Sequence, residues 1–134
     1  MKIKFLTIVT VVCVTLIASG FSFIQPKPWA APADKAKAAN PVKNDAASLA
    51  AGKTLWSTHC SSCHGKAGLG DGSKAAQLKT QPSDFSKVAF QGQTDGSLFF
   101  KVSEGREDMP SFKKKLPDTE DVWNLVNYMR SLKK

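Results

Sequence analysis

The sequence contains few of the residues that build metal clusters, and it lacks the patterns of β-structure. Its 134 residues include only three cysteines and two histidines. Two of the cysteines and both histidines fall within residues 59–64, so four zinc ligands at a usable spacing are hard to find. The chain has no internal repeat and no period-two alternation of useful length, which argues against a sheet and favours helices.

The positive charge of the chain does not indicate a nucleic-acid partner. The formal net charge is +8, but residues 1–45 carry half of the basic excess. Aromatic and basic residues also fail to alternate as they do on a surface that binds single-stranded nucleic acid. We therefore expect no nucleic-acid binding.

Residues 1–24 are predicted to be a signal peptide or a membrane anchor. A short positive start precedes an apolar run, Phe5 to Ile24, that contains no charged residue. About 20 apolar residues suffice to cross a bilayer, and a charged start before such a run is also typical of a secretory signal peptide. Small residues at 18–20 and 31–33 offer two candidate cleavage sites. Both interpretations predict export, to the periplasm or to the outer side of the cytoplasmic membrane.

The composition divides the rest of the chain into a linker and one domain. Residues 25–45 mix four prolines with Ala, Lys and Asn, which predicts a semi-extended linker that forms no core. Residues 46–134 form the predicted domain. A domain of this size often needs a staple or a cofactor, because its own apolar core is small.

The domain contains one motif with a specific chemistry near its start. Residues 60–64 read C-S-S-C-H, which is the attachment sequence of c-type haem. The thiols of Cys60 and Cys63 would form thioethers with the two haem vinyl groups. His64 would then reach the iron from the same side as a neutral axial ligand. The motif predicts one covalent haem c.

Other uses of Cys60 and Cys63 remain open at this point. A redox pair of the thioredoxin type is disfavoured by the adjacent His64 and by the absence of a preceding strand pattern. Half of a zinc site lacks partners, since the domain has no further cysteine and only His59 besides. In an exported chain the two thiols could also close as a disulfide.

Met109 is the predicted ligand on the other side of the iron. It lies in the polar segment 107–111, where an apolar side chain has no evident packing role, and Pro110 keeps this segment out of a helix. A thioether opposite histidine favours ferrous iron and raises the reduction potential. His59 is the alternative ligand, but it adjoins the attachment motif and cannot easily reach the far face of the haem.

These features resemble class I cytochrome c of the short bacterial type. The resemblance rests, in chain order, on residues 60–65, the G-L-G-D-G run at 68–72, residues 105–112 and residues 123–132. It covers essentially the whole predicted domain. It implies an all-α cytochrome c fold, with about three to four helices around one haem and with the first and last helices crossing. It also implies electron transfer as the function.

Hydrophobic spacing and capping signals predict helices in the same places. They favour a helix over residues 47–60, a short one near 73–78, one over 95–104 that stops at Gly105, and a last one after an N-cap at Asp118. Gly52 lies inside the first helix, where it lowers helix propensity by about 1 kcal/mol relative to Ala. A close helix crossing would explain it, and the resemblance suggests a partner near Tyr128.

Two further residues are candidates around the haem. In the resembled family a proline carbonyl often accepts the ring N–H of the ligand histidine, and Pro82 is the candidate for this role. A plain turn proline is the alternative. Arg106, and Lys101 with it, could pair with haem propionates, or both could be solvated surface charges.

The sequence predicts an electron carrier and not an enzyme. With Met109 in the sixth position the iron has no place for a substrate, so no small-molecule substrate is expected. The expected partners are redox proteins of a respiratory or other extracytoplasmic chain, with an acidic face if Lys113-Lys114-Lys115 steers them. An uncleaved N-terminal segment would add a membrane. Two alternatives stay open: a peroxidase or gas sensor with a labile sixth ligand, and an electron-transfer subunit of a larger complex.

Overall fold

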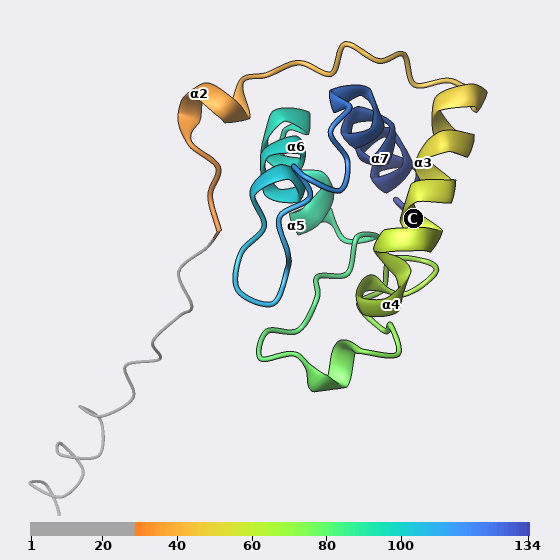
Figure 1. The fold of residues 1–134 in the computed structure, drawn as a ribbon, viewed down its shortest axis with the longest axis vertical. Helices are drawn as coiled ribbons and strands as arrows, with labels where there is room; N and C mark the ends of the chain where they lie inside the picture. The colour runs from red at the N-terminus through yellow and green to blue at the C-terminus, as the bar shows by residue number, and fades with distance from the viewer. Residues whose placement is uncertain (1–28) are drawn as a thin grey trace, which may run out of the picture.

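Helices make up all the regular structure of the domain (Figure 1). The computed structural model describes residues 29–134, and the segment predicted as a signal peptide or anchor lies outside the described residues. In chain order the elements are α2 (Ala33–Ala36), α3 (Ala46–His59), α4 (Ser61–His64), the 3₁₀ turn η1 (Ala75–Gln77), α5 (Val88–Gln91), α6 (Asp95–Glu104) and α7 (Thr119–Ser131). The predicted all-α cytochrome c fold is confirmed. Within residues 29–134 no helix is long and apolar enough to span a membrane.

The three long helices begin where side chains cap them. Asp45, Thr94 and Asp118 each accept a backbone N–H from the first turn of α3, α6 and α7, respectively. The predicted stop of α6 at Gly105 and the predicted N-cap at Asp118 are confirmed. The helices α2, α4 and α5 have four residues each, which is too short for a hydrophobic period to predict them.

α3 and α7 cross in close contact, and this crossing is the centre of the fold (Figure 1). Gly52 lies at the crossing point. A Cβ at this position would overlap the carbonyl oxygen of Asn124 and lie 2.8 Å from Cβ of Tyr128. The crossing near Tyr128 that the resemblance implied is therefore confirmed, and it explains why a residue of low helix propensity occupies the middle of α3.

The core lies between the long helices and the segment that precedes α6. Its largest fully buried side chains are Trp56, Leu98, Leu125 and Val126. Met129 is 4% exposed and belongs to the apolar stripe of α7, as its spacing predicts. Phe99 of α6 is partly buried and stacks on Trp123, with ring centroids 4.2 Å apart.

Most of the predicted linker packs on the domain. Residues 29–45, here called the N-terminal strap, run from α6 across α7 to the start of α3 (Figure 1). Oγ1 of Thr94 donates to the carbonyl of Ala36 at 2.7 Å, and Nδ2 of Asn40 donates to Oδ1 of Asn127 at 2.8 Å. The described part of the segment thus differs from a free semi-extended linker, because its polar groups find partners on the helices. The domain boundary at residue 46 stays a prediction.

Replacing Gly52 by Ala should destabilise the protein although alanine is the better helix former. Overpacking a tight contact costs about 1–3 kcal/mol, which exceeds the propensity gain of about 1 kcal/mol once the helices must separate. Chemical denaturation of the purified protein measures the effect. Lys53→Ala, on the exposed side of the same helix, is the control and should change little. A Gly52→Ala variant as stable as the wild type would contradict the close crossing.

Candidate cofactor site

The C-x-x-C-H motif forms a single turn at the end of α3. Cys60 caps α3, with its N–H bonded to the carbonyl of Trp56 at 2.9 Å. The carbonyl of Cys60 in turn accepts the amides of Cys63 at 3.1 Å and His64 at 2.9 Å. Two thiols and one imidazole therefore project from one short turn, here called the attachment turn. Both thiols are free in the structure.

The environment of Cys60 disfavours a redox dithiol. Burial, and after it the charge of Cys63, raises the pKa of the Cys60 thiol to about 12. Dithiol oxidoreductases instead lower the pKa of their attacking cysteine. Within residues 29–134 no group of three or more His, Cys, Asp or Glu side chains could hold a metal ion, which also disfavours the zinc alternative.

His64 is the best-defined polar side chain of the site. Its ring packs between Phe85, at 4.9 Å between centroids, and Trp56, at 5.8 Å. Burial lowers the pKa of its imidazole, which keeps the ring neutral and able to bind iron. Its Nδ1 is the one buried side-chain N or O atom of the described residues without a hydrogen-bond partner. Such an orphan is rare in a folded protein, and the second ring N–H of a ligand histidine usually donates to a carbonyl or carboxylate.

Trp56 holds the attachment turn against the helix crossing. Its indole Nε1 donates to the carbonyl of Gly65 at 3.0 Å, and its ring also contacts Tyr128 of α7. Phe85 completes this wall and stacks on Phe90 at 3.8 Å. The helix predicted over residues 47–60 includes Trp56, but its packing beside His64 was not predicted. Its position four residues before Cys60, one helical turn away, was the available signal.

Pro82 lies close to the attachment turn but is not bonded to His64. A Cβ at Gly70 would overlap the carbonyl oxygen of Pro82, so this close approach requires glycine at position 70. The amide of Gly70 also bonds to the carbonyl of His64 at 2.9 Å. Because Nδ1 of His64 has no partner, the structure gives no bond between His64 and Pro82. The role of Pro82 stays a prediction.

Met109 is presented by a tight hairpin between α6 and α7. Arg106 and Met109 exchange backbone hydrogen bonds of 2.8 and 3.0 Å, and residues 105–110 are here called the Met109 hairpin. Oγ of Ser111 donates to the carbonyl of Ser103 at 2.6 Å and fixes the hairpin to the end of α6. The Met109 side chain is partly buried against the core. His59, the alternative ligand, ends α3 and packs edge-on against Phe112.

Loop 66–82 connects the attachment turn with the Met109 hairpin. At its start, the amide of Gly72 bonds to the carbonyl of Cys63 at 3.2 Å. At its end, Oδ2 of Asp108 accepts the amides of Lys79 at 2.7 Å and Thr80 at 3.3 Å. Oε2 of Glu107 also accepts the hydroxyl of Thr80 at 2.9 Å. One loop therefore fixes the spacing between the two predicted ligand segments.

Arg106 lies at the edge of the site and makes contacts of its own. Its guanidinium carbon stands 5.0 Å from the ring centroid of Trp29, and Nζ of Lys101 stands 5.4 Å from the same centroid. Burial, and after it the charge of Arg106, lowers the pKa of Lys101. The two residues proposed for propionates thus form one cationic pair against an indole. Their role toward a haem stays a prediction.

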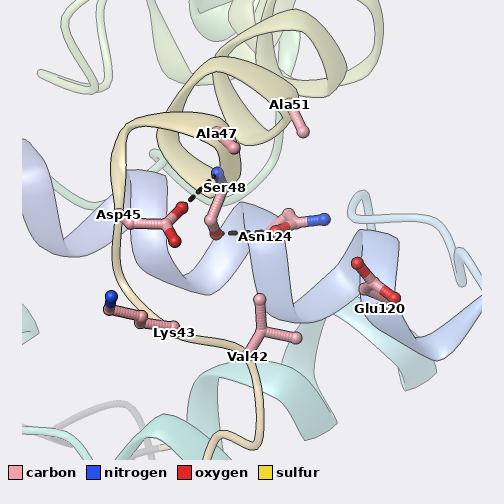
Figure 2. A pocket seen from close by; sticks show the side chains of 8 residues that line it. All are labelled: Val42, Lys43, Asp45, Ala47, Ser48, Ala51, Glu120 and Asn124. Atoms are coloured by element: carbon pink, nitrogen blue, oxygen red, sulfur yellow. Dashed lines mark hydrogen bonds between the residues drawn. The ribbon is translucent and has the colours of Figure 1, made fainter.

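A separate surface hollow of about 350 Å³ lies where the strap meets α3 and α7 (Figure 2). Its lining includes Asp45, Ser48 and Asn124, which are joined by hydrogen bonds, and Glu120. No residue of the attachment turn or the Met109 hairpin lines it. The hollow is a polar seam between elements and is separate from the chemistry of His64.

Comparison with known proteins identifies the class. A family model matches residues 47–129, and the chain is a c-type cytochrome domain. The family is described as cytochrome c oxidase, cbb3-type, subunit III, and the chain belongs to it. A domain of this family implies covalently bound haem c, and the two free thiols and the imidazole on one short turn fit such a group.

A solved structure supports the same class. The chain is similar to a chain of the reducing HAO-like protein complex of Kuenenia stuttgartiensis, with 28% sequence identity and a TM-score of 0.64. The match covers 70% of this chain and 47% of the solved one, so the chain spans about half the length of that relative. No curated protein matches.

Replacing Asp108 by Ala should loosen the Met109 hairpin from loop 66–82. The carboxylate accepts two backbone amides, and losing them should cost about 1–2 kcal/mol locally. Amide hydrogen exchange at Lys79 and Thr80 should then accelerate about tenfold. Asp108→Asn keeps an acceptor oxygen and should retain most of the protection. Equal exchange in the wild type and in Asp108→Ala would show that the carboxylate does not tie the two segments.

Proposed function

We propose that this chain is a mono-haem c-type cytochrome that carries single electrons between extracytoplasmic redox proteins. Cys60 and Cys63 would hold the haem covalently, and His64 and Met109 would be its axial ligands. The observation that carries the proposal is the attachment turn itself, which presents two free thiols together with an imidazole packed beside Trp56 and Phe85. The Met109 hairpin supplies the second ligand from the far end of loop 66–82.

The residues around the site would keep the ligands in place during electron transfer. Haem, when bound, supplies a one-electron Fe(III)/Fe(II) couple. The rings of Trp56 and Phe85 pack against the His64 ring and would restrain its orientation. Asp108 ties the Met109 hairpin to loop 66–82. A site that moves little when the charge changes suits electron transfer without a substrate.

A second candidate role is that of a subunit in a larger redox complex. The family is described as an oxidase subunit, and the solved relative comes from a protein complex. In this role the chain would pass electrons within an assembly and not between freely diffusing partners. Co-purification of the tagged full chain with other redox proteins would favour this role.

We also propose that the chain is exported, with residues 1–24 as its targeting segment. Domains of this family are typically extracytoplasmic. The charged start and the apolar run to Ile24 provide a signal that either a signal peptide or an anchor would use. Fractionation of cells that express the full chain would place the haem protein.

Visible spectroscopy of the matured full-length protein tests the ligand set. Sharp reduced α and β bands with a weak far-red oxidised band are expected for low-spin iron with His64 and Met109. Met109→Ala should lose the far-red band and bind carbon monoxide when reduced, whereas His59→Ala should change neither. Cys60→Ala with Cys63→Ala should abolish haem staining on a denaturing gel. A wild type with broad high-spin bands that respond to carbon monoxide would favour a peroxidase or gas sensor.

The three lysines at 113–115 are proposed to steer an acidic redox partner. Nζ of Lys113 lies 2.6 Å from Oε1 of Glu104, and Nζ of Lys115 lies over the ring of Phe112, so both ammonium groups follow the hairpin closely in the fold. Replacing all three by Gln should slow oxidation by anionic hexacyanoferrate about twofold or more at low salt and flatten its salt dependence. The same change at Lys53, Lys133 and Lys134 is the control. Identical salt slopes for both variants would remove the steering role.

A further inference from the structure

The N-terminal strap lies outside the part of the chain that the family model matches. That match begins at residue 47, whereas the strap covers residues 29–45. The strap nevertheless makes specific contacts at three successive places on the domain. Its path leads from the start of α3 over α7 and α6 toward the Met109 hairpin (Figure 1).

The first contact is a buried polar network between the strap, α3 and α7. Asn127 is 4% exposed, and its Oδ1 accepts from Asn40 at 2.8 Å. Its Nδ2 donates to Oγ of Ser48 at 2.8 Å, and Ser48 donates to Oδ1 of Asn124 at 2.6 Å (Figure 2). A buried amide whose bonds are all made favours one register of the segments it joins. The strap is therefore fixed at its C-terminal end.

In the second contact, α2 packs on the first turn of α6. Thr94 caps α6 and also donates to the carbonyl of Ala36. A Cβ at Gly96 would overlap the carbonyl oxygen of Lys35 and lie 2.8 Å from that of Ala38. The backbone of the strap thus lies where the side chain of any other residue at position 96 would begin. This position of α2 sets the direction of the residues that precede it.

The third contact joins the strap to the Met109 hairpin. The indole of Trp29 packs against the guanidinium of Arg106 and the ammonium of Lys101. Arg106 is the residue that exchanges both backbone bonds with Met109. Asp108 of the same hairpin is bonded to loop 66–82. Trp29 therefore contacts the hairpin at Arg106, a residue to which loop 66–82 makes no direct hydrogen bond.

We propose that the N-terminal strap positions the Met109 hairpin, with Trp29 as a positioning residue that acts through Arg106. By stabilising the closed hairpin, Trp29 lowers the fraction of molecules in which Met109 has left the iron. This inference rests on the proposed function, in which Met109 is an axial ligand. It adds to that function a segment that the family match does not include.

The strap also discriminates between the two candidate cleavage sites. Cleavage after Ala33 would remove Trp29 and the first residue of α2. Cleavage near residues 18–20, or retention of the whole segment, would leave the strap intact. The positioning role therefore requires that the mature chain begins at or before Trp29. N-terminal sequencing of the exported holoprotein should give such a start, and a chain that begins at Asp34 would overturn the proposal.

Imidazole binding to the ferric full-length holoprotein tests the positioning role directly. An external ligand binds only where Met109 has dissociated, so its apparent affinity reports the open fraction. Loss of the indole should raise the affinity about threefold to thirtyfold in Trp29→Ala, from the usual strength of cation–π contacts. Trp29→Leu should behave similarly, and Trp29→Phe should recover most of the wild-type value. Lys37→Ala, an exposed change within the strap, should have no effect.

The outcomes separate this inference from the function on which it rests. Unchanged imidazole affinity in Trp29→Ala and Trp29→Leu, even with a lower denaturation midpoint, would overturn the positioning role and leave Met109 ligation intact. If Met109→Ala binds imidazole no more tightly than the wild type, then Met109 is not a ligand. That result would overturn the proposed function and the positioning role together.

Discussion

The close crossing of α3 and α7 is the constraint on which the site depends. Because Gly52 lets the two helix backbones approach, Trp56, one turn further along α3, contacts the ring of Tyr128 of α7. The ring of Trp56 then packs in the core, and its indole N–H donates to the carbonyl of Gly65, the residue after His64. The crossing thus fixes the position of the imidazole through a single side chain. As the proposed iron ligand, a pre-organised His64 would need no rearrangement when the iron changes charge.

The two predicted ligands are held in different ways. His64 lies among aromatic rings that belong to the core, so its position is as stable as the fold itself. Met109 lies on a hairpin held by a small set of contacts: backbone bonds to Arg106, the bond from Ser111 to Ser103, the bonds of Asp108 to a neighbouring loop, and the packing of Trp29 on Arg106. Opening the hairpin would break a few exposed bonds but would not unpack the helices. Local opening of this kind costs less than global unfolding, so the methionine side is where ligand exchange would begin.

The sequence predicted the parts of this fold that local rules determine. Hydrophobic spacing and capping chemistry predict α6, its end at Gly105 and the N-cap Asp118. The order of residues 60–64 alone predicts haem attachment. The strap could not be predicted, because its attachment depends on Asn40 meeting Asn127, 87 positions away. The same holds for Phe85 beside His64 and for Asp108 at the amides of loop 66–82. Such contacts depend on the tertiary fold, which residue spacing does not encode.

The N-terminal strap is ordered on the domain although its composition predicts a linker. A proline-rich composition predicts a semi-extended linker, since proline stiffens a chain without building a core. Yet prolines also reduce the entropy that an ordered segment loses, so the same composition suits a segment that lies flat on a surface. The polar partners at Asn127 and Thr94 and the cations at Lys101 and Arg106 then decide between the two. In this chain they favour the ordered state, so the described part of a segment that composition assigns to a linker lies on the helices and contacts the Met109 hairpin.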